Sequence, residues 1–339
     1  MDNLEKKTIQ TSRFTYTYYV SAPTPNRPTL LLLHGFPDDA HLWDGVAAKL
    51  GQYRLIVPDL LGYSGTSKPT DPAAYNHADL SRDLVEILDA EKVEKVVSVG
   101  HDWGSAVAQR LYNFHPDRVA GLVLLNVGYA PPSPERFDLA AFNAQTEATF
   151  GYPLFAYQEF FVSAEASRIL DADPGRFYDG LHGAGRDWMR ELFCVRGNMR
   201  KWMLDEGEEG KGKGEKRWTV EPSPYVVRDP GARDAFVARF RRDGFAAPLC
   251  YYRAVSENVQ SEAAKRVPAE NHVVRVPTLY VICSQDAVCR PEGSAAAKKA
   301  GLLPDIEEAT IDSGHWSPYE KPDEVAQLMN SFLERRFSS

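Results

Sequence analysis

The segment Gly100-His101-Asp102-Trp103-Gly104 presents one carboxylate in a setting that suits nucleophilic attack on carbon. It follows the apolar run 96–99 and precedes a helical pattern over 105–114. Glycines at this spacing are typical of a nucleophile elbow, a sharp strand-to-helix turn with no room for larger side chains. Most such turns carry serine at the apex, and an aspartate there forms an alkyl ester when it attacks carbon. The pattern predicts that Asp102 is a nucleophile; the alternative is that Asp102 only caps the following helix.

An ester on Asp102 must be hydrolysed by water that a base activates, and His315 is the candidate general base. His315 lies in Asp312-Ser313-Gly314-His315-Trp316, just before a C-terminal helical pattern. Asp286 follows the apolar run 279–282 and is placed to orient the imidazole by accepting its other N–H group. Taken singly, both residues fit ordinary surface loops. Their order along the chain, nucleophile then acid then histidine, favours a catalytic triad over helix capping by Asp102.

Two backbone N–H groups, those of Phe36 and Trp103, are candidates for an oxyanion hole. Ester hydrolysis passes through a tetrahedral intermediate whose oxyanion needs two donors already in position. Phe36 belongs to His34-Gly35-Phe36-Pro37, a turn after the apolar run 30–33, where proline permits a cis peptide bond. By itself this segment fits an ordinary turn at the end of a strand equally well. Beside the elbow, the oxyanion hole is the favoured interpretation.

The segments that must position these residues alternate between strands and helices. Continuous apolar runs, typical of strands buried on both faces of a parallel sheet, occupy 30–33, 55–57, 96–99, 122–125 and 279–282. Helical periodicity marks 80–88 and 325–333, and residues 8–20 alternate as an antiparallel ribbon. The sequence therefore predicts an α/β fold built on a doubly wound, mostly parallel sheet.

The alternation of strands and helices is interrupted once. It stops at a Gly/Pro-rich hinge near residue 128 and resumes near residue 273. We expect an α/β core formed by residues 1–128 and 273–339, with a mainly helical lid, residues 129–272, inserted into its second half. The lid includes the tract 206–216, whose glycines, lysines and glutamates cannot bury apolar surface. This tract is expected to be a mobile loop without chemistry of its own.

Composition excludes several classes of function. The 339 residues, 43% hydrophobic and 25% charged, support a sizeable core, and no apolar stretch is long enough to span a membrane. A net charge of -8 with scattered basic residues predicts a small-molecule partner rather than nucleic acid. The 4 cysteines are widely spread and metal-binding spacings are missing, so we expect no disulfide framework, no metal and no cofactor. The N-terminus lacks the apolar core of a secretory signal, which favours a cytoplasmic location.

Taken together, these motifs resemble those of the soluble epoxide hydrolase family of α/β-hydrolases over nearly the whole chain. Four segments carry the resemblance: His34-Gly35-Phe36-Pro37, Gly100-His101-Asp102-Trp103-Gly104, Ser284-Gln285-Asp286 and Gly314-His315-Trp316. The resemblance implies the α/β-hydrolase fold and the conversion of hydrophobic epoxides to vicinal diols. The reaction would pass through a covalent ester on Asp102 that water activated by His315 then hydrolyses.

The resemblance also implies two lid tyrosines that donate hydrogen bonds to the epoxide oxygen, and Tyr157 and Tyr252 match them by local context. A phenol with a pKa of about 10 donates to a developing alkoxide while staying neutral at rest. The alternative is that both only pack an aromatic lid, and Tyr152 and Tyr251 are neighbouring choices. The residues expected to contact the substrate are Phe36, Trp103, Tyr152 and Phe155.

Two other functions fit part of the pattern. A dehalogenase also attacks carbon with an elbow aspartate, but haloalkane dehalogenases often have asparagine where this chain has Phe36. Fluoroacetate dehalogenases have arginine after the nucleophile, where this chain has Trp103. A ligand receptor without activity has no need of nucleophile, acid, base and donors together. Neither the physiological epoxide, its role in detoxification or elsewhere, nor the oligomeric state follows from the sequence.

Overall fold

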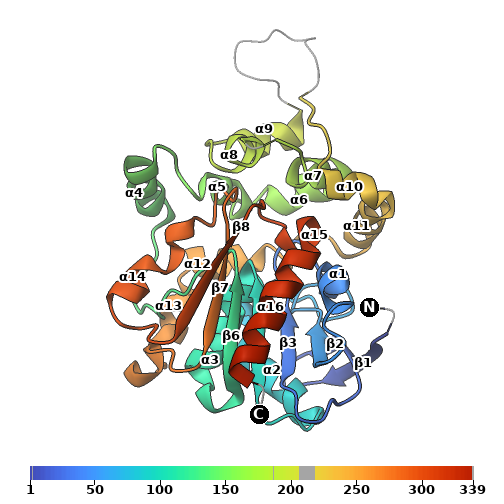
Figure 1. Cartoon of the computed structure of the whole chain (residues 1–339). Coiled ribbons are helices and arrows are strands. Elements are labelled where there is room, and N and C mark those ends of the chain that lie inside the picture. Colours follow the sequence, from blue (N-terminus) through green and yellow to red (C-terminus); the bar gives the residue numbers. More distant parts are fainter. Residues whose placement is uncertain (2, 186, 206–217, 338–339) are drawn as a thin grey trace.

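The computed structural model of the protein describes residues 1, 3–185, 187–205 and 218–337 (Figure 1). Its sheet has eight strands in the order β1-β2-β4-β3-β5-β6-β7-β8. The strands are β1 (Glu5–Gln10), β2 (Thr15–Val20), β3 (Thr29–Leu33), β4 (Arg54–Pro58), β5 (Val96–His101), β6 (Val119–Leu125), β7 (Thr278–Cys283) and β8 (Ile306–Ile311). Strands β3 to β8 pair in parallel, and β1 and β2 join antiparallel at one edge.

The predicted doubly wound sheet is confirmed, because each apolar run of the sequence lies in one of the parallel strands. In β5 all six residues are buried, as expected of a strand covered on both faces. The edge strand β8 was missed by sequence reasoning, since its residues alternate between half-buried and exposed and form no continuous apolar run. Residues 8–20 form the turn and much of the β1–β2 ribbon.

Helices cover both faces of the sheet. Helices α2 (His77–Ala90) and α3 (Trp103–Phe114) pack together on one face, and α1 (Asp44–Ala47) and α16 (Pro322–Phe337) pack on the other (Figure 1). Shorter core helices are α14 (Ala295–Lys299) and α15 (Ser317–Glu320). Within the described residues, no helix combines the length and apolar character needed to cross a bilayer.

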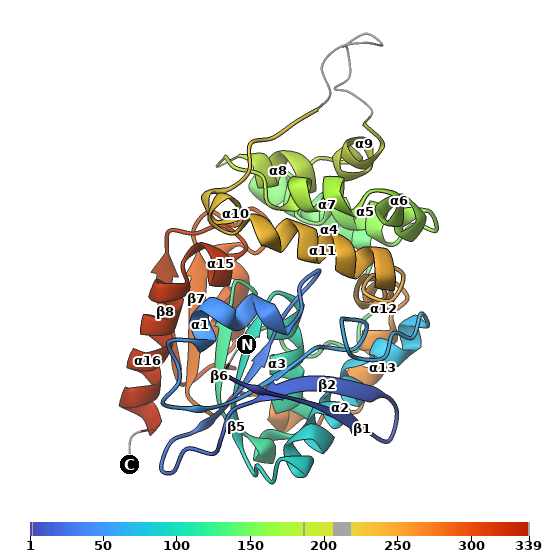
Figure 2. The same ribbon diagram turned by 90° about the vertical axis from the view of Figure 1, so that its right-hand side faces the viewer.

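The residues between β6 and β7 are mainly helical. Figures 1 and 2 show α4 to α11 gathered above one end of the sheet. They are α4 (Leu139–Phe150), α5 (Ala156–Phe161), α6 (Ala166–Ala172), α7 (Pro174–Leu181), α8 (Trp188–Phe193), α9 (Asn198–Leu204), α10 (Pro224–Arg228) and α11 (Pro230–Asp243). The chain returns through α12 (Cys250–Ser256) and α13 (Val259–Ala264), and α13 packs against α2. The whole tract 206–216, expected to be a loop, lies outside the described residues.

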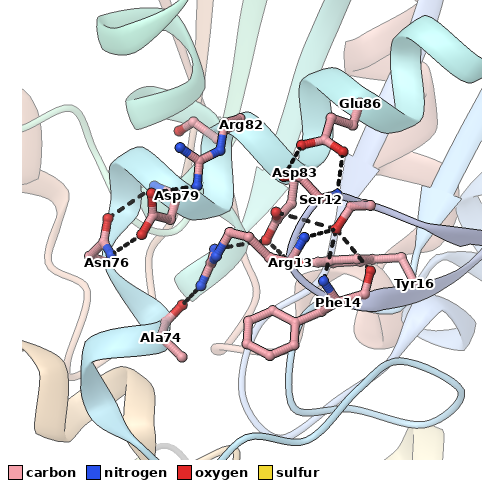
Figure 3. Close-up of polar contacts among 12 residues, drawn as sticks. Ser12, Arg13, Phe14, Tyr16, Ala74, Asn76, Asp79, Arg82, Asp83 and Glu86 are labelled. Carbon is pink, nitrogen blue, oxygen red and sulfur yellow. Dashed lines mark hydrogen bonds and ion pairs between the residues drawn. The ribbon is translucent and has the colours of Figure 1, made fainter.

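Polar contacts anchor the N-terminal ribbon to α2 (Figure 3). Asp83 of α2 is fully buried and accepts hydrogen bonds from Arg13 and the Tyr16 hydroxyl, each at 2.9 Å. Burial raises the pKa of Asp83 to about 6, although the Arg13 charge opposes this rise. At the start of α2, the Asn76 side chain caps the helix by accepting from the Asp79 N–H group at 3.0 Å.

Candidate active site

Asp102 lies at a strained turn between β5 and α3. Its backbone angles are φ 54° and ψ -124°, in a region that non-glycine residues rarely occupy. A Cβ atom at Gly104 would overlap with the backbone of Leu33, and one at Gly100 would overlap with the backbone of Gly104. The turn therefore needs both glycines, as the sequence predicted for an elbow.

The carboxylate of Asp102 has a donor on each oxygen. The Phe36 backbone N–H group donates to Oδ1 at 2.8 Å, and Nε2 of His315 lies 3.5 Å from Oδ2. Burial raises the pKa of Asp102, but the hydrogen bond and charge of His315 outweigh burial and bring the pKa below its usual value. The carboxylate is therefore ionised at neutral pH, as a nucleophile must be.

His315 is held by Asp286. Its Nδ1 lies 2.6 Å from Oδ2 of Asp286, whose other oxygen accepts the N–H groups of Val288 at 2.9 Å and Cys289 at 2.8 Å. Burial lowers the pKa of His315, but the charge of Asp286 and the hydrogen bonds to Asp102 and Asp286 raise it well above its usual value. The ring therefore presents Nε2 to Asp102 with its other nitrogen fixed.

The two expected oxyanion donors lie beside Asp102. Phe36 precedes a cis peptide bond to Pro37, and its N–H group already donates to the Asp102 carboxylate. Trp103 is the first residue of α3, so its N–H group has no acceptor within that helix. An oxyanion that forms on the Asp102 carboxyl carbon would lie next to both residues.

Tyr157 on α5 and Tyr252 on α12 lie above the nucleophile. Both are buried, with ring centroids 5.9 Å apart, and both line one small space with Asp102 and His315. Burial, with the nearby Asp102 charge as a smaller contribution, raises the pKa of Tyr157. Burial also raises the pKa of Tyr252, with Tyr157 and Asp102 adding to the effect. Both phenols therefore stay protonated and able to donate.

The small space at Asp102 lies between two larger cavities. The α3-side cavity, of about 450 Å³, shares Asp102, Tyr157 and Val288 with it. The α15-side cavity, of about 410 Å³, shares four residues with it, Leu181, Met189, His315 and Trp316. The α3-side cavity therefore leads to Asp102, and the α15-side cavity leads to His315.

A family model described as alpha/beta hydrolase fold matches residues 28–170. Epoxide hydrolase A of Mycobacterium tuberculosis is 29% identical to the chain over 93% of this chain and 92% of its own length. Bifunctional epoxide hydrolase 2 of Rattus norvegicus is 28% identical over 91% of this chain, which spans only 52% of that relative. The chain therefore has the α/β-hydrolase fold, and the relatives that it resembles over nearly its whole length are epoxide hydrolases. The crystal structure of Epoxide Hydrolase A from Mycobacterium thermoresistibile shares the fold, with a TM-score of 0.75 at 24% identity and 98% coverage of both chains.

The four residues expected to contact an epoxide lie in different parts of the structure. Phe36 lines the small space at Asp102, and Trp103 and Phe155 line the α3-side cavity. Tyr152 lines none of the three, because its hydroxyl contacts the Ala287 carbonyl at 3.2 Å and accepts from Arg290 at 3.1 Å. We therefore do not propose Tyr152 as a residue that contacts the substrate.

The other neighbouring tyrosine, Tyr251, also lies apart from these cavities. Its ring packs at 5.0 Å from Tyr75 and 5.9 Å from Tyr63, and its hydroxyl is buried with no hydrogen-bond partner among the described residues. Between the neighbouring choices, geometry favours Tyr252.

Sequence reasoning missed the groups that support the triad. Nδ2 of Asn126, directly after β6, donates to Asp286 at 2.8 Å, and Ser317 donates to the Asn126 side chain at 3.2 Å. Nε2 of His101 lies 2.7 Å from the backbone carbonyl oxygen of His315. A polar residue directly behind the apolar run 122–125 was the available signal for Asn126.

One group of metal-ligating side chains occurs among the described residues. Ligand atoms of Asp286, Cys289 and His315 lie within 4.8 Å of one another. Asp286 and His315 are already hydrogen-bonded together, and both belong to the triad geometry. We derive no metal chemistry from this group.

Proposed function

We propose that the protein hydrolyses hydrophobic epoxides to vicinal diols through a covalent ester on Asp102. The observation that carries the proposal is the surroundings of this carboxylate. One oxygen accepts the Phe36 N–H group at 2.8 Å, the other lies 3.5 Å from His315, and two protonated phenols line the same space. The names of the relatives, epoxide hydrolases from bacteria to mammals, support the same reaction.

In the first step, Asp102 attacks one carbon of the oxirane. The carbon–oxygen bond of the ring breaks, and the oxygen takes the bonding electron pair while Tyr157 and Tyr252 donate hydrogen bonds to it. A proton from one phenol completes the hydroxyl group. Hydrogen bonds aimed at a developing alkoxide stabilise the transition state more than the ground state, which is what acceleration requires.

In the second step, His315 removes a proton from water, and the hydroxide attacks the carbonyl carbon of the ester. The N–H groups of Phe36 and Trp103 stabilise the resulting oxyanion, and Asp286 stabilises the imidazolium. Collapse breaks the bond between the acyl carbon and the ester oxygen, and that oxygen takes the proton of the imidazolium. The proton left on the Asp102 carboxyl group returns to the phenolate, which restores the free enzyme. The diol leaves with one oxygen from Asp102, and the carboxylate keeps one oxygen from water.

The proposal includes three further expectations from the sequence. Residues 1–128 and 273–339 form the core, and residues 129–272 form the lid. The reaction partners are an epoxide and water, without a cofactor. The location is cytoplasmic.

A dehalogenase is the alternative function for a protein of the same fold. It would need side-chain donors for a halide beside Asp102, and Phe36 offers none.

Single turnover in heavy-oxygen water tests the ester. With enzyme in excess over a styrene-type epoxide, the first cycle should leave the label in the Asp102 peptide and none in the diol. His315→Gln should form the ester and accumulate it, detected by intact mass. Label in the diol after the first cycle, or no adduct in H315Q under conditions where the wild type turns over, would contradict the mechanism.

A further inference from the structure

One face of α3 lines the α3-side cavity from the nucleophile outward. Trp103, Ala106 and Arg110 all line this cavity, at positions one, four and eight residues beyond Asp102. Residues at such spacings lie on one side of a helix. Eight residues of α-helix advance roughly 12 Å, so Arg110 lies about that far along the axis from Asp102, and its side chain leans back toward the elbow.

Arg110 is a half-buried cation without an acid partner. Its Nη1 donates to the Asn113 side chain at 2.9 Å and to the Ala130 carbonyl at 3.0 Å, both neutral groups. Burial lowers the pKa of Arg110 to about 10, and in the described part of the chain no carboxylate lies within 4.0 Å of its guanidinium. By contrast, the largely buried Arg54 and Arg239 each pair with a carboxylate at 2.6 Å. A half-buried charge without an acid partner is costly, so its presence beside a substrate cavity points to an anionic ligand.

His77, at the start of α2, is an independent sign of a missing ligand. It is 7% exposed, lines the same cavity, and its buried Nε2 has no hydrogen-bond partner among the described residues. Burial, with Arg110 as a smaller contribution, lowers the pKa of His77 to about 3, so the ring is neutral. A neutral imidazole in this position can supply one N–H donor beside the guanidinium.

The rest of the cavity lining is largely apolar. It includes Val127, Phe137, Phe155 and Ala264, together with the polar side chains of Gln158, Gln260 and Ser261. Among the described residues, the only carboxylate on the lining besides Asp102 is Glu135, which is exposed and lies next to Arg136, an exposed cation on the same lining. The cavity is therefore largely apolar, with a nucleophile at one position and a half-buried cation farther along α3.

We propose that Arg110 and His77 form a subsite for a carboxylate at the end of the substrate remote from the oxirane. The inference rests on the proposed function and narrows it to epoxides that carry an anionic end group on an apolar chain. The helix α3 then acts as a ruler, because the distance between Asp102 and Arg110 selects the spacing between oxirane and carboxylate.

The test compares ω-epoxy carboxylic acids of increasing chain length with their methyl esters. The wild type should prefer the acid over the ester in kcat/KM by about 10- to 100-fold, as expected for a hydrogen bond to a charged group. The preference should be greatest for chains near the Asp102–Arg110 spacing. Arg110→Gln, which keeps a donor for the Ala130 carbonyl, should remove the preference, whereas Arg110→Lys should keep part of it. Arg82→Met removes the same charge from α2 outside the cavity, where Arg82 pairs with Asp79 (Figure 3), and should leave the preference unchanged.

Equal turnover of acid and ester by the wild type would overturn the subsite without any variant. So would an acid preference that survives in R110Q or that R82M abolishes equally. In these cases turnover itself would leave the proposed function standing. If neither substrate is turned over, the proposed function fails, and calorimetric binding of the saturated acid decides the subsite alone. Binding at least about 10-fold weaker in R110Q supports the subsite, and equal binding overturns it.

Discussion

His315 lies between two carboxylates, and only one of them keeps its charge through the reaction. Asp286 remains ionised beside Nδ1, whereas Asp102 becomes a neutral ester once it attacks carbon. The hydrogen bond to Asp102 is one of the interactions that raise the pKa of His315 in the free enzyme. Forming the ester therefore lowers the pKa of His315, which frees the ring to accept a proton when water must be activated.

Asp102→Asn imitates the neutral ester and should lower the pKa of His315, measured by histidine ring signals in an NMR titration. Asp44→Asn is the matched control, because Asp44 hydrogen-bonds to the exposed His41 at 3.0 Å and raises its pKa. D44N should lower the pKa of His41 and leave His315 unchanged. A pKa of His315 in D102N equal to or above that of the wild type would contradict the argument.

The fall in the pKa of His315 on ester formation predicts how the rate of each of the two steps depends on pH. Asp102 has a lowered pKa, so it stays ionised as the pH falls and the alkylation rate should change little. Ester hydrolysis needs neutral His315 and should slow as the pH falls below the pKa of the ester form. Rapid-quench mass spectrometry should therefore find more ester at acidic pH, and a constant fraction of ester would argue against His315 as the base.

At the scale of elements, the elbow works because β3, β5 and α3 approach more closely than side chains permit. Gly104→Ala would force a Cβ into the backbone of Leu33 on β3, and such overpacking costs about 1–3 kcal/mol. Gly51→Ala is the control, since no atom lies within 4 Å of the added Cβ, and should change stability by less than about 0.5 kcal/mol. Urea unfolding measures both, and equal stability losses would contradict this account of the elbow.

The elements predicted from sequence are those whose environment is uniform along the chain. Strands such as β5 are buried throughout, so their residue types reveal them, and the glycines of the elbow follow from a local steric need. Strand β8 lies at the sheet edge and escaped that rule.

The positions of the side chains in the lid depend instead on packing between segments that are distant in the sequence. Tyr152 and Tyr157 lie close together in the sequence, yet one contacts the Ala287 carbonyl and the other lines the small space at Asp102. Arg110 shows the same limit, because only the fold reveals that no carboxylate of the described residues pairs with it. A spacing of residues along the chain identifies a nucleophile more readily than it identifies the walls of a substrate cavity.

At the scale of the whole molecule, one buried ion pair connects α11 to the loop that carries the oxyanion donor Phe36. Arg239 of α11 pairs with Asp39 at 2.6 Å and donates to the Pro37 carbonyl at 2.9 Å. Both charged side chains are largely buried, 12% and 14% exposed. Burial raises the pKa of Asp39, but the charge of Arg239 outweighs burial and lowers it below its usual value. The position of Phe36 beside Asp102 therefore depends on α11.

Arg239→Met should destabilise the protein by about 3–5 kcal/mol, because it leaves a buried carboxylate without its cation. It should also slow ester hydrolysis, since the Phe36 N–H group loses a support of its loop. Arg242→Met is the control on the same helix, because Arg242 is 64% exposed and its partner Asp243 keeps a second cation, Lys68, at 3.8 Å. Urea unfolding and single-turnover kinetics measure the two effects. Adding Asp39→Asn to R239M should recover part of the stability by removing the unpaired charge. If R239M and R242M unfold at the same urea concentration, the stability of the protein does not depend on the ion pair between Arg239 and Asp39.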